Sequence, residues 1–396
     1  MRLVLDGRIV IQRMTGAGRY VIELARRLPN LTRDLAVEVL LLPTMQATRI
    51  PNMLSDAGAK VHYVNARVAS LQQWLVIPRV LGRLKPDLYH YPFFDLPYVK
   101  SPSVVTIYDL NPMLHVDYFH HLARLKNEVA RALMRSTLRR SRAAFAISEA
   151  TRRLVQEHYP GSVNKVRTIH LGVDSNAWAG KVSDVRSTWG IGAAETPWRS
   201  RSYVLYVGVD RPHKNLVRLV RSFGRFRVTK GWQQGSGPYL WLAGVGIGSP
   251  ELRTQVSEMG LGTDVRLHPE LDEADLRAAY NGAVAVAYVS TSEGFGLPLL
   301  EAFAAGVPVL TSDVSSLPEV GGDAVLYANP HDEMAMSEAI GRIWNDEQLR
   351  RTLVARGRQR VTEFSWDATA LATCEAYYDV LGLTSTLGRR KDDSCT

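Results

Sequence analysis

The amino-acid sequence predicts an α/β protein built from two doubly wound, Rossmann-like domains that face each other across a cleft. Short apolar runs alternate with helical segments along most of the chain, which is typical of parallel sheets covered by helices on both faces. The chain has 396 residues, of which 46% are hydrophobic, and a single core rarely grows past roughly 250–300 residues. The alternation stops at Ser175–Ser202, which is rich in Gly, Ser, Ala and Trp, and then restarts.

The first domain is predicted to cover residues 1–180. Its strands are expected at Arg2–Asp6, Ala36–Leu42, Lys60–Val64, Asp87–Tyr91, Ser103–Ile107 and Ala143–Ile147. Its helices are expected at Gly18–Leu28, Gln72–Leu84 and His120–Arg140. We interpret Ser175–Ser202, which contains Pro197, as the connection to the next domain together with a surface insertion.

The second domain is predicted to cover residues 181–365. Strands are expected at Tyr203–Val207, Tyr239–Ala243, Asp264–His268, Val284–Tyr288 and Val307–Thr311. Helices are expected at Asn215–Arg227, Pro250–Met259, Glu273–Asn281, Pro298–Ala305 and Glu333–Trp344. The polar residues 384–396 are expected to form a disordered tail.

The cysteines and the N-terminus favour a cytoplasmic protein. The two cysteines, Cys374 and Cys395, lack the spacing of a metal site and cannot staple a chain of this length, which fits a reducing compartment. The N-terminal sequence MRLVLDGRIV has no basic segment followed by a long apolar stretch, so we expect no signal peptide. Apolar runs such as Ala283–Val289 are far shorter than the ~20 residues that span a bilayer.

Positive charge is concentrated in the first half of the chain. Residues 1–180 contain 25 Lys and Arg against 13 Asp and Glu, a balance of +12, whereas the remainder has 23 against 26, a balance of −3. This asymmetry indicates either an anionic partner or a surface tuned for solubility. The predicted helices in Gln72–Lys85 and His120–Arg142 combine basic and apolar residues, so an anionic membrane surface is a possible partner. Nucleic acid is not expected, because no DNA-binding motif accompanies the charge.

The most informative motif is Glu293-Gly-Phe-Gly-Leu-Pro-Leu-Leu-Glu301, which follows a strand and enters a helix. Its glycines allow backbone to approach a ligand, and the amides of Phe295, Gly296 and Leu297 lie at the positive end of the helix. Glu301 can accept two ribose hydroxyls, and Glu293 can accept hydroxyls of a sugar. The alternative is a glycine-rich turn with ordinary acidic residues.

Two other loops follow predicted strands and open helices. In Gly208–Asn215, Arg211 and Lys214 can neutralise a diphosphate, although the loop can also be a solvated turn capped by Asn215. In Thr15–Arg19, Gly16 and Gly18 form a turn suited to phosphate approach, but the pattern is not a full dinucleotide fingerprint. Arg19 there is either a ligand or a solvated helix residue.

Tyr108 and Asp109 follow another predicted strand. Asp109 either orients a substrate hydroxyl or caps the next turn. His90 and His115 are expected to be structural. The sequence has neither the Ser/His/Asp order of a hydrolase nor a His/Cys metal cluster.

Taken together, these residues resemble family 4 of the retaining glycosyltransferases, which have the GT-B fold. The resemblance covers nearly the whole chain. It rests on the two glutamates of the motif above, on EAFAAGVPVLTSDVSSLPEVGGDAVLY after Glu301, on VGVDRPHKN as a phosphate loop, and on AISEATRRLVQEHY followed by HLGVD. FSWDATALATCEAYYDVL resembles the closing helix, which in this fold crosses back to the first domain, so residues 366–383 are assigned to that domain.

The resemblance implies a role for each matching residue. Glu301 would bind the ribose, and Glu293 with the amides of Phe295, Gly296 and Leu297 would hold the donor sugar and its phosphates. The diphosphate would be bound by Lys214 and the donor would lie above Gly16 and Gly18. No metal or other cofactor is implied. Tyr108 stands where family members often have His, and Val209 stands where many have Arg, a role that Arg211 can take over.

The implied activity is that of a retaining hexosyltransferase that uses a nucleotide sugar. The segment looks closest to the mannosyl- and rhamnosyl-transferring branch that acts on bacterial surface polysaccharide such as lipopolysaccharide. GDP-mannose is therefore the first expected donor, and a saccharide or lipid-linked saccharide is the expected acceptor. A GT-B-like sugar-nucleotide 2-epimerase and a non-catalytic sugar-nucleotide-binding protein are the alternatives.

Overall fold

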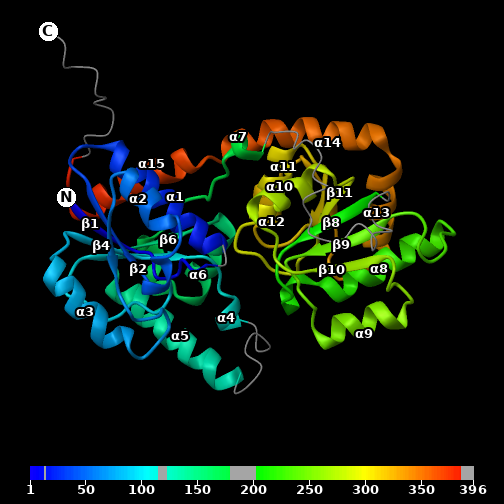
Figure 1. The fold of residues 1–396 in the computed structure, drawn as a ribbon. Helices are drawn as coiled ribbons and strands as arrows, with labels where there is room; N and C mark the ends of the chain where they lie inside the picture. The colour runs from blue at the N-terminus through cyan, green and yellow to red at the C-terminus, as the bar shows by residue number, and fades with distance from the viewer. Residues whose placement is uncertain (13–14, 115–122, 179–201, 385–396) are drawn as a thin grey trace, which may run out of the picture. The chain divides into compact units, whose positions relative to one another are not determined.

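The computed structural model describes residues 1–12, 15–114, 123–178 and 202–384, which form two compact units (Figure 1). The first unit comprises Met1–Gly172 and Trp366–Thr396, and the second comprises Val173–Ser365. The chain enters the second unit before residue 180, because the short helix α7 (Ser175–Trp178) packs on α11 (Leu297–Ala305) of that unit. Most of the expected insertion and tail, and His115, lie outside the described residues.

The first unit contains a seven-stranded parallel sheet in the order β3-β2-β1-β4-β5-β6-β7. Its strands are β1 (Arg2–Asp6), β2 (Ala36–Leu41), β3 (Lys60–Tyr63), β4 (Leu88–Tyr91), β5 (Ser103–Ile107), β6 (Ala143–Ala146) and β7 (Val166–Thr168). The strand order reverses between β1 and β4, which pair through Leu3↔Leu88 and Leu5↔His90. In an open parallel sheet, the loops that follow two such strands diverge and leave room for a ligand.

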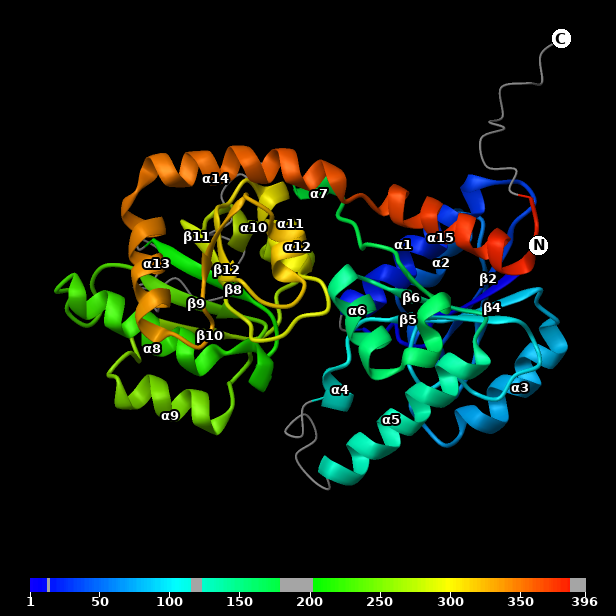
Figure 2. The same cartoon turned by 180° about the vertical axis from the view of Figure 1, so that it is seen from behind.

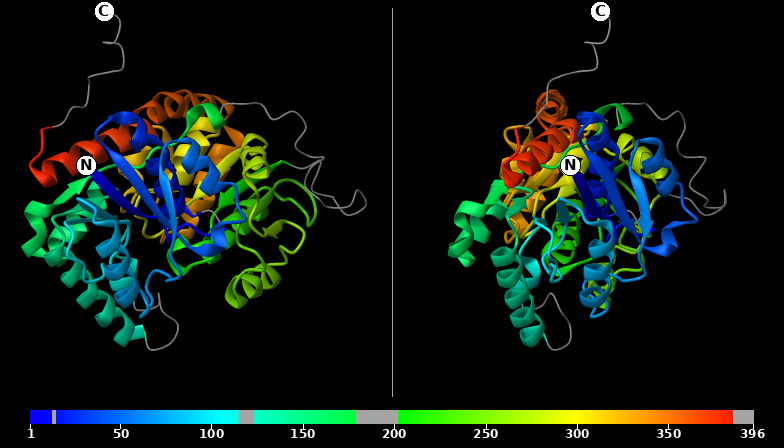
Figure 3. Two further views of the ribbon diagram at one scale, coloured as in Figure 1. Left: turned by 60° about the vertical axis from the view of Figure 1, so that its left-hand side comes forward. Right: turned by 90° about the vertical axis from the view of Figure 1, so that its left-hand side faces the viewer.

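Helices cover both faces of this sheet (Figure 2). On one face, α3 (Gln73–Leu84), α5 (Ala123–Arg140) and α6 (Glu149–His158) bury Ile77, Met134 and Val155 in a single apolar cluster. On the other face, α1 (Gly16–Leu31) packs beside α15 (Trp366–Leu381), although they lie near opposite ends of the chain (Figure 3). The remaining helices are α2 (Ile50–Asp56) and α4 (Asn111–Leu114), with 3₁₀ turns at Pro43–Met45 and Pro160–Lys165.

The second unit repeats the architecture with a six-stranded parallel sheet in the order β10-β9-β8-β11-β12-β13. Its strands are β8 (Tyr203–Val207), β9 (Tyr239–Ala243), β10 (Val265–His268), β11 (Ala285–Tyr288), β12 (Val309–Ser312) and β13 (Val325–Ala328). Its other helices are α8 (Leu216–Thr229), α9 (Pro250–Glu258), α10 (Glu273–Asn281), α12 (Leu317–Gly321), α13 (Glu333–Asn345) and α14 (Glu347–Arg360), with 3₁₀ turns at Pro212–Lys214 and Val361–Glu363. Here the order reverses between β8 and β11, which pair through Val286↔Leu205.

The predicted fold class is confirmed, and most predicted strands are placed within a residue or two. α1 begins at Gly16 rather than Gly18, because the Thr15 side chain accepts the Gly18 amide and caps the helix there. The sequence analysis missed β7, β13, α2, α4, α6, α7, α12 and α14. β7 has only three residues, and α14 is so polar that it shows little apolar periodicity.

Within the described residues, no helix is long and apolar enough to cross a lipid bilayer.

Candidate active site

The structure brings together two predicted loops at the carboxyl ends of β8 and β11. The backbone N–H of Thr291 donates to the His213 carbonyl at 2.8 Å. Asn215, a residue with a φ of +62°, extends its side-chain amide to the carbonyls of Val289 at 3.0 Å and Pro330 at 2.7 Å. These bonds hold the loop that carries Lys214 against the loop that carries Glu293.

Lys214 and Glu293 form an ion pair at this position. The Lys214 Nζ lies 2.7 Å from the Glu293 Oε1 and 2.6 Å from the Tyr288 hydroxyl. The side chains are 13% and 10% exposed, so the pair is mostly buried but still reaches solvent at the rim of the fold. Burial alone would raise the pKa of Glu293, but the charge and hydrogen bond of Lys214 outweigh it and the pKa is lowered. Glu293 is therefore a carboxylate at neutral pH.

The glycine motif turns into α11 as predicted. Gly296 has a φ of +120°, and a Cβ there would lie 3.1 Å from a methyl group of Leu317, so only glycine suits the position. The N-cap residue of α11 is Gly296, which has no side chain to cap the helix. The positive end of this helix, with Gly296 and Leu297, can therefore attract an anion. Phe295, by contrast, is buried and packs edge-on to Phe364.

Two serines that the sequence analysis missed fasten this motif from the loop after β12. The Glu293 amide donates to the Ser315 hydroxyl at 2.9 Å. The Ser316 hydroxyl lies 3.0 Å from the Glu293 carbonyl and 2.8 Å from the Phe295 carbonyl. A hydroxyl has one proton, so Ser316 donates to one of these carbonyls at a time. The serines hold the backbone of the glycine motif, and only tertiary structure reveals their role.

Glu301 lies in α11 and is only 7% exposed. Its Oε2 accepts a hydrogen bond of 2.9 Å from the Tyr280 hydroxyl on α10. Arg211, the other cation predicted in the phosphate loop, has an exposed side chain. The structure thus brings Lys214, Glu293 and the start of α11 together, with Glu301 one turn into that helix.

The other candidates belong to the first unit. Gly16 is exposed at the start of α1, whereas Gly18 is buried and its amide is used by the Thr15 cap, 3.0 Å away. Asp109 Oδ1 accepts the Asn111 amide at 2.8 Å, as in the capping alternative. The Tyr108 hydroxyl is buried and has no hydrogen-bond partner within the described part of the chain. Its ring packs edge-on to Tyr20.

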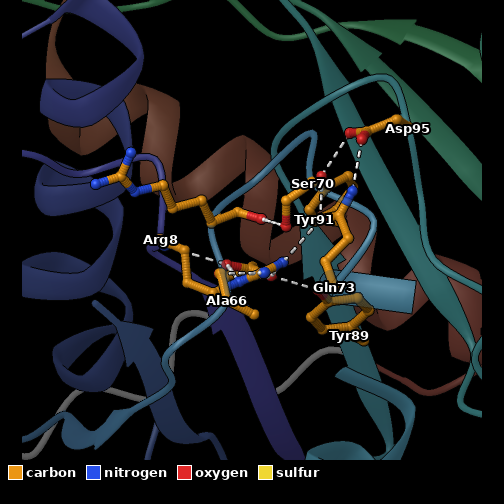
Figure 4. A network of polar contacts seen from close by, with 9 residues as sticks. Arg8, Ala66, Ser70, Gln73, Tyr89, Tyr91 and Asp95 are labelled. Carbon is orange, nitrogen blue, oxygen red and sulfur yellow. Dashed lines mark hydrogen bonds and ion pairs between the residues drawn. The ribbon is translucent and has the colours of Figure 1, made fainter. Parts of the chain in front are cut away.

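A buried polar network lies at the carboxyl ends of β1 and β4, the switch point of the first unit (Figure 4). Arg8 and Asp6 form an ion pair at 2.6 Å with both side chains fully buried. Arg8 also donates to the Ala66 carbonyl at 2.8 Å, and Tyr89 donates to Asp6. The Arg8 guanidinium thus ties the loop after β1 to the loop after β3.

The network continues through Tyr91, Gln73 and Asp95. Tyr91 donates to Asp95 Oδ1 at 2.6 Å, and the Gln73 amide donates to Asp95 Oδ2 at 2.5 Å. Burial raises the pKa of Asp95 to about 6, although these two donors oppose the shift. The sequence analysis missed this network, whose residues form no local motif.

His90 is structural, as expected. It is fully buried between Tyr377 of α15, 2.6 Å from its Nδ1, and Thr106 of β5, 2.7 Å from its Nε2. Burial lowers its pKa to about 3, so the ring is neutral at pH 7. In the described part of the chain, no group of three or more His, Cys, Asp or Glu residues could hold a metal ion.

Comparison with known proteins places two family models on the chain. The model described as Glycosyltransferase Family 4 matches residues 14–177, and the model described as Glycosyl transferases group 1 matches residues 194–360. The first match includes Tyr108 and Asp109, which follow β5, and the second includes Lys214, Glu293 and Glu301.

Similar proteins agree with these matches. The O-antigen chain mannosyltransferase B of Escherichia coli is 26% identical over 390 residues, which cover 95% of this chain and 99% of the relative. Among solved structures, sucrose-phosphate synthase from Thermosynechococcus elongatus has a TM-score of 0.75 at 19% identity and covers 96% of this chain and 99% of that one. The Anabaena protein HepE in complex with UDP-glucose has a TM-score of 0.69 at 17% identity, covering 96% and 100%.

Proposed function

Because the chain belongs to glycosyltransferase family 4 and has the GT-B fold, we propose that it is a retaining hexosyltransferase. The proposed donor is GDP-mannose, and the proposed acceptor is a hydroxyl of a saccharide or lipid-linked saccharide in surface polysaccharide synthesis. The E. coli relative, an O-antigen mannosyltransferase, supports mannose and this class of product. The HepE complex with UDP-glucose supports a nucleotide sugar as the donor, with uridine as the alternative nucleoside.

The observation that carries the proposal is the meeting of Lys214, Glu293 and the start of α11 at the switch point of the second unit. In the proposed complex, Glu301 accepts the ribose hydroxyls, and the diphosphate lies between the Lys214 ammonium and the N–H groups of Gly296 and Leu297. Lys214 then exchanges Glu293 for a phosphate oxygen. The Glu293 carboxylate becomes available to hydroxyls of the donor sugar.

The proposed transfer breaks the bond between the anomeric carbon and the diphosphate oxygen and forms one to the acceptor oxygen, and the proton of the acceptor hydroxyl passes to the departing diphosphate. Negative charge grows on the departing diphosphate, so a fixed cation and a helix N-terminus stabilise the transition state more than the ground state. We propose that these groups suffice without a divalent metal. Activity that EDTA abolishes and Mg²⁺ or Mn²⁺ restores would contradict this.

In the first unit, we propose that Asp109 orients the acceptor hydroxyl. Its Oδ1 is engaged by the Asn111 amide, which fixes the carboxylate relative to β5. We propose that Tyr108 contacts the donor sugar but does not act as a base. Burial holds the pKa of its hydroxyl well above the usual value, so the hydroxyl stays protonated.

We also propose that the first unit binds an anionic membrane surface through α3 and α5, which cover the same sheet face (Figure 2). Of the apolar residues in the segment Gln72–Lys85, Ile77 and Leu81 are buried in the core and cannot face a membrane. Four apolar side chains remain exposed: Leu71 just before α3, Leu75 on α3, and Leu125 and Val129 on α5. Exposed Arg79, Arg83, Arg135 and Arg139 accompany them.

Vesicle co-sedimentation tests this surface. Binding to vesicles with anionic lipid should fall as salt rises, because the attraction is screened over about 8–10 Å at physiological ionic strength. Binding that is equal for neutral and anionic vesicles, or absent for both, would contradict the membrane proposal. The positive charge of the first unit would then be explained by solubility alone.

The decisive assay for the function mixes the protein with GDP-mannose and a saccharide acceptor and measures GDP and the glycosylated product. A transferase releases GDP together with product. A 2-epimerase converts the donor without acceptor, and a non-catalytic binding protein does neither. A thermal-shift screen of nucleotides and nucleotide sugars identifies the base if GDP-mannose is inactive, since a bound ligand stabilises the folded state.

A further inference from the structure

The carboxylate of Glu301 is held by a side chain outside the glycosyltransferase motifs described above. Tyr280, at the end of α10, is fully buried and donates its hydroxyl proton to Glu301 Oε2 at 2.9 Å. The Pro298 carbonyl also lies near this hydroxyl, at 3.4 Å. The shorter distance and the charge of the carboxylate make Glu301 the preferred acceptor.

The Tyr280 ring is itself fixed by a residue of α7. Trp178 is 2% exposed and packs edge-on to Tyr280, with ring centroids 5.2 Å apart and an interplanar angle of 89°. Arg277, one turn before Tyr280, donates to the Ala177 carbonyl at 2.8 Å, which fastens α7 to α10. A ring held in this way places its hydroxyl oxygen at a fixed point.

A fixed hydroxyl matters because a glutamate side chain has three rotatable bonds. A free glutamate loses rotamer entropy when it must accept hydrogen bonds in one geometry, and that loss weakens binding. A carboxylate already held on one oxygen has lost part of that freedom before the ligand arrives. Two adjacent hydroxyls demand a defined orientation of the carboxylate, whereas a single hydroxyl tolerates several.

We propose that Tyr280 is a positioning residue that orients Glu301 for the two hydroxyls of a ribose, and that Trp178 supports it by fixing its ring. This inference rests on the proposed function, in which Glu301 accepts the ribose of the nucleotide donor. The orientation of Glu301 by Tyr280 would then allow the site to bind ribonucleotides more tightly than 2′-deoxyribonucleotides.

The test measures affinity for a ribonucleotide and its 2′-deoxy analogue by titration calorimetry. The probes are GDP and 2′-deoxy-GDP, or UDP and 2′-deoxy-UDP if UDP is the nucleotide that binds. The wild-type protein should prefer the ribonucleotide by about tenfold or more, as expected for one hydrogen bond to a charged group. In Tyr280→Phe, which keeps the ring on Trp178, the preference should fall to roughly twofold as that hydrogen bond loses its geometry.

The matched control is Tyr203→Phe. Tyr203 is another buried tyrosine of the second unit, and its hydroxyl donates its proton to the Ala279 carbonyl at 2.8 Å. This variant should keep the wild-type preference, because loss of a buried hydroxyl that does not orient Glu301 alters both affinities alike. If Tyr280→Phe does not fold, Trp178→Phe, which retains the Tyr280 hydroxyl, should lower the same preference.

The variant Glu301→Gln separates the positioning role of Tyr280 from the proposed ribose-binding role of Glu301. If Glu301→Gln and Tyr280→Phe both lose the preference, the positioning role is supported. If Glu301→Gln loses it while Tyr280→Phe keeps it, the positioning role is overturned and the proposed function stands. If Glu301→Gln keeps the wild-type affinity and preference, the ribose role of Glu301 fails, and the inference fails with it.

Discussion

The two units place an ion pair at the same point of the same topology, but they bury it to different degrees. In the first unit, Arg8 and Asp6 lie where the strand order reverses, and both side chains are 0% exposed. In the second unit, Lys214 and Glu293 lie at the corresponding reversal, with side chains 13% and 10% exposed.

This difference separates a structural pair from a pair that can exchange partners. Arg8 also donates to other fixed acceptors, including the Ala66 carbonyl, so its guanidinium connects the loops after β1 and β3. Lys214 lies at a rim, next to a helix N-terminus that attracts anions. If the proposed donor site is correct, a doubly wound domain can use its switch point either as a scaffold, as in the first unit, or as a binding site, as in the second.

The largest expected effect is on the buried pair. Arg8→Met removes the cation and leaves Asp6 in the core without its partner, which should lower the free energy of unfolding by about 3–5 kcal/mol. Urea denaturation of Arg8→Met and wild type measures it. Lys214→Met is the matched control and should lose less stability than Arg8→Met, because Lys214 and Glu293 are 13% and 10% exposed and the carboxylate left behind can reach water. Equal losses would remove the distinction between the pairs.

Substitution of Lys214, which should affect stability less than substitution of Arg8, should have a large effect on nucleotide affinity. Lys214→Met should weaken binding of GDP by about 1.5–3 kcal/mol, the value of a hydrogen bond to a charged group. Titration calorimetry checks this, with Arg221→Met as the control, because Arg221 pairs with Glu333 on α13. GDP affinity that is unchanged in Lys214→Met would show that the rim pair does not hold phosphate.

The stability of the first unit should depend on pH through His90. Its pKa is about 3 in the folded protein, below the ordinary value of 6.5 for histidine, so the unfolded chain binds more protons between these two pH values. The contribution of His90 to stability is therefore present above pH 6.5 and declines as pH falls, by up to about 1.4 kcal/mol per pH unit. Urea denaturation of wild type and His90→Asn at pH 7 and pH 5 measures it. An equal change in both proteins would assign the pH dependence to other groups.

The smallest expected effect is at Tyr108. Its hydroxyl has no hydrogen-bond partner among the described residues, so Tyr108→His should retain transferase activity, and Tyr108→Phe should do the same. Asp109→Asn should be the more damaging change, because it removes the carboxylate proposed to orient the acceptor. Steady-state kinetics of the three variants decides the roles, and an inactive Tyr108→Phe beside an active Asp109→Asn would reverse them.

The fold and the placement of the glycine motif at the end of a strand could be predicted because their signals are local. β8 has an apolar run of five residues, and the motif from Glu293 to Glu301 lies within one loop and one helix. The supporting residues could not be predicted in this way. Tyr280 and Ser316 meet the motif only through tertiary contacts, and the network around Arg8 draws on four separate segments.

The most direct test of the central claim is titration of GDP into Glu301→Ala and Glu293→Ala. If the second unit holds the donor as proposed, Glu301→Ala weakens GDP binding by about 1.5–3 kcal/mol. Glu293→Ala keeps GDP affinity close to wild type but loses turnover with GDP-mannose, because Glu293 contacts the sugar. Unchanged GDP affinity in Glu301→Ala would contradict the ribose assignment and with it the proposed donor site.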